Sequence, residues 1–141
     1  MKKFKFNLEK ILQLRKFKEE ECKLVLGQAI SALNKIENDI KMTALKRHNA
    51  SCERFKYPLE TSSWDLYILR LEQETEKLAQ KAAQAEIIVE EKRSLYLEAQ
   101  KELKAMEKLK EKQKDAYRNE YLNNEMNLVD EITASRFVLT K

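Results

Sequence analysis

The chain has 141 residues, a length that suits one ordinary globular domain, but 37% of its residues are charged, only 8% are aromatic, and it contains one glycine and one proline. So little glycine and proline argues against a fold with many strands and turns, and the bias toward Ala, Glu, Lys, Leu, Gln and Arg is typical of long helices and coiled coils. The formal net charge is only +4, which argues against a polybasic nucleic-acid binder.

The first predicted element is a helix over about residues 7–56, with Asn7 as a favoured N-cap. Apolar residues follow at alternating spacings of four and three. This spacing makes a narrow stripe, here called the seam, which must be buried against a second helix. A disordered chain would share the high charge but would lack this sustained period. Two polar residues, Arg15 and Glu19, interrupt the seam, whose apolar members are Leu8, Leu12, Cys22, Leu26, Ala29, Leu33, Ile36 and Ile40.

The seam of the first helix becomes ambiguous over residues 41–56. Strict continuation of the spacing turns polar residues inward, namely Thr43, Arg47 and Arg54. One extra step of four residues, a stutter, would instead turn inward Ala44, Ser51 and Phe55. The sequence leaves both alternatives open, and we expect this stretch to pack less well than the rest of the seam.

A turn is predicted over residues 57–62, because Pro58 cannot continue the first helix. Ser62 or Ser63 then caps a second helix over about residues 63–137. Its seam contains Trp64, Ile68, Leu71, Leu78, Ala82, Ala85, Val89, Tyr96, Ala99, Leu103 and Met106. The predicted fold is all-α: one domain over residues 1–141, formed by a long antiparallel two-helix coiled-coil hairpin with a longer C-terminal helix.

The two helices are predicted to be unequal in length. If residue 55 lies opposite residue 63, the numbers of paired residues sum to about 118, so that Leu33 faces Ala85 and Leu8 faces Lys110. The first helix ends there, while the second continues with no local partner. An unpaired apolar helix implies a partner, a self-contact or fraying. Its apolar residues are Tyr117, Tyr121, Leu122, Met126, Leu128, Val129 and Ile132.

Charge is distributed unevenly along the chain. Residues 1–57 carry 14 basic and 7 acidic side chains, whereas residues 58–141 carry 14 and 17. Opposite net charges favour pairing of the two helices within one chain. Residues 1–18 alone carry seven basic side chains against Glu9. Such a basic end suits nucleic acid, anionic lipid or an acidic protein, and we favour the acidic protein.

No residue pattern points to catalysis, to a metal or cofactor site, or to a small-molecule substrate. His48 is the single histidine, and we expect it to be solvated. Cys22 and Cys52 are too far apart on one helix to form a disulfide, and free thiols favour a reducing compartment. Without a secretion signal or a membrane span, we expect a cytoplasmic protein. At the turn, Tyr57 and Tyr67 are candidate protein-binding residues beside Trp64.

Both ends of the chain resemble the flagellar export protein FliJ family. At the start, the resemblance rests on residues 4–12, Phe-Lys-Phe-Asn-Leu-Glu-Lys-Ile-Leu, followed by Arg15 and by glutamates at 19–21. Near the end it rests on Ala99, Glu102, Leu103, Glu107, Lys108, Leu109, Lys110, Tyr117, Glu125, Asp130, Glu131, Ile132, Arg136 and Phe137. The middle of the chain departs more from the family, so the resemblance assigns no gate-contact residues.

The resemblance implies a non-enzymatic component of the bacterial flagellar type III protein export apparatus. Such a protein is a coiled coil similar to the stalk of rotary ATPases. It binds the hexameric export ATPase, couples it to the membrane protein of the export gate, and assists chaperones and their substrates. It would be cytoplasmic and peripheral to the inner membrane at the flagellar base.

We predict that the ATPase contacts the open end of the hairpin, which is residues 4–12 with residues 126–137. The apolar contact residues would be Phe4, Phe6, Leu8, Leu12, Leu128, Val129 and Phe137, with Asp130, Glu131 and Arg136 setting the register. One alternative is a generic coiled-coil scaffold or chaperone escort with no ATPase contact. A nucleic-acid-binding hairpin is a third interpretation, with salt-sensitive binding as its signature, and an enzyme is a distant fourth.

Overall fold

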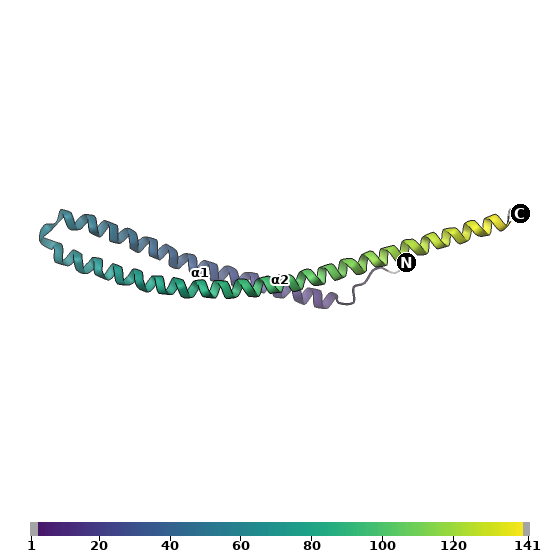
Figure 1. Cartoon of the computed structure of the whole chain (residues 1–141), viewed down its shortest axis with the longest axis horizontal. Coiled ribbons are helices and arrows are strands. Elements are labelled where there is room, and N and C mark those ends of the chain that lie inside the picture. The colour runs from purple at the N-terminus through teal and green to yellow at the C-terminus, as the bar shows by residue number, and fades with distance from the viewer. Residues whose placement is uncertain (1–2, 140–141) are drawn as a thin grey trace. The chain divides into compact units, whose positions relative to one another are not determined.

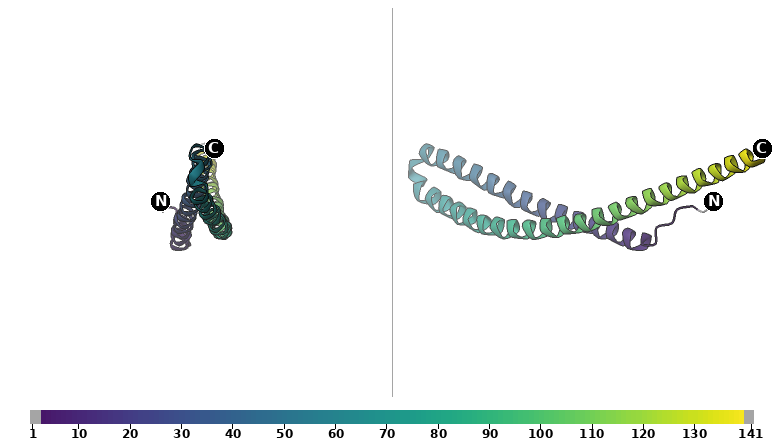
Figure 2. Two further views of the ribbon diagram at one scale, coloured as in Figure 1. Left: turned by 90° about the vertical axis from the view of Figure 1, so that its left-hand side faces the viewer. Right: turned by 45° about the vertical axis from the view of Figure 1, so that its right-hand side comes forward.

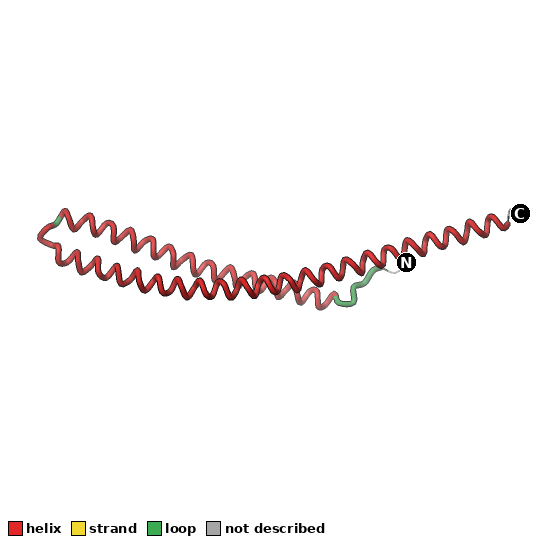
Figure 3. Tube along the Cα trace, viewed as in Figure 1, coloured by secondary structure: helices red, strands yellow, loops and turns green. Residues whose placement is uncertain are grey.

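The computed structural model describes residues 3–139, and side chains up to residue 138. Two helices account for nearly all of this range: α1 (Glu9–Lys56) and α2 (Thr61–Leu139), joined by a short 3-10 turn, Pro58–Glu60 (Figure 1). Along residues 3–139 there is no strand, and Figure 3 shows loop only before Glu9 and at the turn. The predicted all-α hairpin with a longer C-terminal helix is confirmed.

The helices are bounded slightly differently from the prediction. α1 begins two residues after Asn7, the predicted cap, which lies in a turn. α2 begins at Thr61, ahead of the predicted caps Ser62 and Ser63, and runs two residues beyond the predicted end at 137. The described chain groups into two compact units: unit 1 is Met1–Glu19 with Ala99–Lys141, and unit 2 is Glu20–Glu98. Both helices run through both units. The single coiled-coil domain over residues 1–141 stays a prediction.

Unit 2 contains the turn, from which α1 and α2 run side by side (Figure 2). Two ion pairs join the helices there. Arg54 Nε lies 2.8 Å from Asp65 Oδ1, and Arg47 Nη2 lies 2.8 Å from Glu72 Oε1. Each pair of residue numbers sums to 119, close to the register of about 118 that the sequence predicts.

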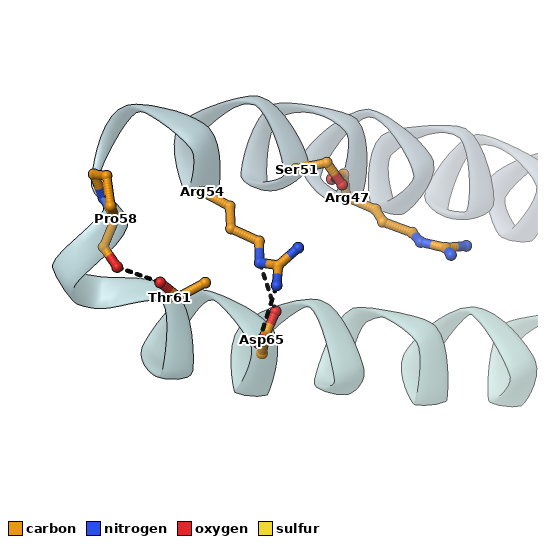
Figure 4. A network of polar contacts seen from close by, with 6 residues as sticks. All are labelled: Arg47, Ser51, Arg54, Pro58, Thr61 and Asp65. Atoms are coloured by element: carbon orange, nitrogen blue, oxygen red, sulfur yellow. Dashed lines mark hydrogen bonds and ion pairs between the residues drawn. The ribbon is translucent and has the colours of Figure 1, made fainter.

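The turn has its own hydrogen bonds, one of which, from Thr61 to Pro58, is drawn in Figure 4. Tyr57 takes φ −125° and ψ 77°, outside the helical region, as a residue before proline must. Its backbone N–H donates to the Glu53 carbonyl at 3.3 Å, and its own carbonyl accepts from the Glu60 N–H at 3.1 Å. The Thr61 hydroxyl donates to the Pro58 carbonyl. Helix therefore resumes within three residues of the proline.

In the ambiguous part of α1, burial follows strict continuation at Thr43 and in part at Arg54, whereas Arg47 is exposed. Thr43 is 4% exposed and Ala50 is 2% exposed, whereas Ala44 and Phe55 are exposed. Thr43 can be buried because its hydroxyl donates to the Asp39 carbonyl at 2.8 Å. Of the three residues that the stutter would turn inward, Ala44 and Phe55 are exposed and Ser51 is half-buried, so the stutter is wrong. The looser packing expected over residues 41–56 stays a prediction.

Candidate protein-interaction site

The N-terminal residues of the candidate site pack inward on α2 within unit 1. The side chain of Phe6 is 8% exposed and that of Leu12 only 1%. Phe4 is half-buried, and its ring lies 5.6 Å from the ring of Tyr117, inclined by 46°. Leu8 is also half-buried, and its carbonyl accepts the N–H of Leu12 at 2.9 Å. These four residues stabilise the open end and leave little surface of their own for a partner.

Ion pairs tie the first turns of α1 to α2 in the same unit. Lys110 Nζ lies 2.9 Å from Glu9 Oε2, and Gln13 donates to Glu9 Oε1 at 3.1 Å. These hydrogen bonds, first from Lys110 and then from Gln13, hold the pKa of Glu9 below its ordinary value. Arg15 and Lys18 both pair with Glu102. Part of the basic cluster in residues 1–18 is thus neutralised within the chain, and Lys2 lies outside the described residues.

The C-terminal part of α2, residues 122–138 and here called the overhang, is exposed along its whole length. Three apolar side chains, Leu122, Met126 and Val129, recur at spacings of four and three, which places them on one face of the helix. Together with Glu125 and Asp130 they line a shallow hollow. Glu125 accepts the Tyr121 hydroxyl at 2.6 Å, and that hydrogen bond raises the pKa of Tyr121 above its ordinary value.

The predicted contact residues therefore divide into two groups. Those from α1 and the segment before it are buried or half-buried, as described above. Those from α2 are all exposed: Leu128, Val129, Asp130, Glu131, Arg136 and Phe137. Leu122 and Met126 belong with this second group, and their helical spacing with Val129 was the sequence signal that identifies them. That a partner binds these residues stays a prediction.

The two candidate residues at the turn lie in unit 2. Tyr57 is 51% exposed, beside the fully exposed Leu59. Tyr67 is partly exposed, and its ring meets Trp64 edge-on at a centroid distance of 6.2 Å and an interplanar angle of 75°. Trp64 itself is half-buried on the seam. Tyr57 and Tyr67 are thus accessible to a partner, and their role in binding stays a prediction.

The side chains that could ligate a metal ion do not cluster in the described range. Residues 3–139 contain no group of three His, Cys, Asp or Glu side chains that could hold a metal ion. Cys22 is half-buried, while Cys52 is exposed and its Sγ lies 3.9 Å from His48 Nε2. None of the helices in this part of the chain combines the length and apolar character that a bilayer span requires.

Comparisons with known proteins give one finding. The family model described as "Flagellar FliJ protein" matches residues 4–140, which is nearly the whole chain. Comparison with curated proteins and with solved structures gave no match. The matched range includes both ends of the hairpin and the turn, so it covers the whole candidate site. The chain therefore belongs to the flagellar FliJ protein family.

Proposed function

We propose that this chain is a non-enzymatic, stalk-like component of the flagellar type III export apparatus. In this role it binds the hexameric export ATPase, couples it to the export gate, and assists in handling export chaperones. Membership of the family makes the chain a flagellar export-related protein. The ATPase, the gate, the chaperones and a cytoplasmic position at the inner membrane belong to the proposal.

The exposed overhang is the observation that supports ATPase binding. An isolated helix gains most of its stability in a protein by burying its apolar face. Residues 122–138 expose Leu122, Met126, Leu128, Val129 and Ile132 on a helix that no other described part of the chain covers. A single helix of this kind has the shape that a narrow ring of subunits can enclose. Asp130 and Glu131 would then meet basic groups of the ring, which would fix the register.

The test is binding and stimulation of the same organism's export ATPase. A truncation after Tyr121 removes the overhang but keeps the Phe4–Tyr117 ring contact and the Glu9–Lys110 ion pair. We expect the full chain to bind and stimulate the ATPase and the truncated chain to do neither.

Two full-length variants make the test specific to side chains. Met126→Ser with Val129→Ser should weaken ATPase binding by about tenfold or more, as should Asp130→Arg with Glu131→Arg. A matched control, Leu66→Ser with Leu69→Ser, alters two exposed residues of unit 2 and should bind as the wild type does. Equal binding by the truncated chain would move the contact off the overhang. No binding by the full chain would reject the ATPase role and favour a scaffold.

A further inference from the structure

Unit 2 has an apolar groove between its two helices, away from the turn. A groove there is lined by Cys22 and Val25 from α1 and by Lys92 and Leu95 from α2, with Glu21 at its edge. Cys22 is a half-buried seam residue, and Lys92, also half-buried, lies between the seam residues Val89 and Tyr96 on the same face of α2. Val25 and Leu95 each lie one position before a seam residue, Leu26 and Tyr96. The groove is therefore open on one side of the hairpin.

An exposed apolar residue extends this groove along α2. Ile88 lies two turns before Leu95 on the same face of α2, and the two side chains are 47% and 52% exposed. We call Val25, Ile88 and Leu95 the apolar flank.

The opposite side of the same stretch differs in chemistry. The positions one after a seam residue hold mainly charged side chains, Lys23, Glu86, Glu90 and Arg93, with Ile30 and Leu97 as the partly exposed apolar side chains. A two-helix hairpin needs only its seam to be apolar. When the apolar stripe widens to one flank on both helices, it has the width of a helix that packs against more than one neighbour. The apolar flank thus suits a third helix.

The charged residues at the rim of the groove indicate which kind of helix would bind there. Glu91 lies between Ile88 and Leu95 on the helix surface, Glu98 lies one turn after Leu95, and Glu21 lies one turn before Val25. All three carboxylates are exposed, whereas Lys92, the one ammonium that lines the groove, is half-buried. A partner with basic residues beside its apolar stripe complements this rim. A second copy of the chain, bound symmetrically, would bring two acidic rims together.

We propose that the apolar flank is a docking site for an amphipathic helix of a partner protein that carries Lys or Arg beside its apolar stripe. The helix would lie in the groove between α1 and α2 and form a local three-helix coiled coil. This site goes beyond the proposed function, since it lies in unit 2 and needs no ATPase.

The probe is a synthetic helical peptide of about four heptads with Leu and Ile in its stripe, Lys on both flanks and a fluorescein label. The control peptide has Glu in place of each Lys. In an anisotropy titration of the full chain we expect the Lys peptide to bind and the Glu peptide to bind at least about tenfold more weakly. Added salt should weaken binding of the Lys peptide.

Two sets of variants locate the binding. Ile88→Ser with Leu95→Ser should weaken binding of the Lys peptide by about tenfold or more. Glu91→Lys with Glu98→Lys should weaken its binding by a similar factor at low salt. The control Leu66→Ser with Leu69→Ser should leave peptide binding unchanged, as should truncation after Tyr121. All variants change exposed residues, and an unchanged helical signal and melting temperature would confirm that they fold.

The two cysteines give a second readout that reports position. Cys22 lines the groove, so bound peptide should slow its alkylation, while Cys52, which is exposed elsewhere, should react at the same rate with and without peptide. Unchanged alkylation of Cys22, or equal binding by the Ile88→Ser/Leu95→Ser variant or by the Glu peptide, would overturn the proposal. So would a dimer in sedimentation that this variant converts to a monomer, because a second copy would then occupy the flank.

Discussion

The ring of Phe4 lies 5.6 Å from the ring of Tyr117, so a residue from the non-helical segment before α1 packs on α2. Phe6, two residues later, is 8% exposed. The Phe4–Tyr117 ring contact and the burial of Phe6 therefore hold this segment in unit 1 even though it forms no helix.

Replacing Phe4 with Ala should lower the free energy of unfolding by about 1 kcal/mol, because the ring contact with Tyr117 is lost. Phe4→Tyr, which keeps a ring, should change it by less. Urea denaturation of Phe4→Ala, Tyr117→Ala and the double variant gives the coupling energy between the two rings. A coupling energy indistinguishable from zero would contradict the contact.

Two leucines on nearly opposite faces of α1 should respond differently to the same substitution. Leu12 is 1% exposed and Leu14 is 66% exposed. Leu12→Ala should reduce the free energy of unfolding by about 2–4 kcal/mol, whereas Leu14→Ala should change it by no more than about 0.5 kcal/mol. Chemical denaturation followed by helical circular dichroism measures both. Similar losses for the two variants would show that Leu14 is also buried, for instance in an oligomer.

The single glycine of the chain, Gly27, lies inside α1 with no positive φ, and a Cβ built on it meets nothing within 4 Å. Alanine is favoured over glycine in a helix interior by about 1 kcal/mol. Gly27→Ala should therefore raise the free energy of unfolding by about that amount, with a higher melting temperature. A destabilised variant would mean that another chain approaches the backbone closely at this position.

The Glu9–Lys110 pair should make stability depend on pH. The pKa of Glu9 is lower in the folded chain than in the unfolded one, so the pair stabilises the fold at neutral pH. That contribution is lost as the pH falls below the ordinary carboxyl pKa of about 4.3 and through the lowered folded-state value. Melting temperatures of the wild type and Lys110→Met should differ most near neutral pH, at low salt, and converge in acid.

A direct measurement of the same pair is the carboxyl titration of Glu9 by NMR. Lys110→Met should return the pKa of Glu9 toward its ordinary value, and added salt should do so in part. The weaker hydrogen bond from Gln13 remains in that variant, so the return should be incomplete. A Glu9 pKa that does not respond to Lys110→Met would remove Lys110 as the main cause.

The seam could be predicted from the sequence because apolar spacing alone determines it. Every predicted seam residue from Leu8 to Ile40 and from Trp64 to Met106 is buried or half-buried. The continuation through Thr43, Arg47 and Arg54 could not be decided in the same way. These residues are polar. Thr43 satisfies its hydroxyl within α1, on the Asp39 carbonyl one turn earlier, and the two arginines form tertiary ion pairs with Glu72 and Asp65 on α2, which the apolar spacing does not reveal.

The candidate site was predicted only in part, for a related reason. Apolar residues at both ends of a chain look equally available in a sequence. Phe6 and Leu12 prove to be buried because α2 passes beside them in unit 1, whereas Leu128 and Val129 are exposed because α1 does not reach that far. The apolar flank was missed because Ile88 and Leu95 fall one position before seam residues, where charged residues are usual.

The ion pairs between the helices also bear on which changes in chain length the protein can tolerate. Arg47 pairs with Glu72 and Arg54 with Asp65 because the two residues of each pair lie at matching distances from the three-residue turn, one on each helix. Seven residues inserted into α1 alone would change the partner of every α1 residue on the side of the insertion away from the turn. Seven more residues inserted at the matching level of α2 would restore these pairs. Seven residues added after Tyr121 would leave those pairs in place and lengthen only the overhang. The length of the overhang is therefore free to change independently of the paired helices.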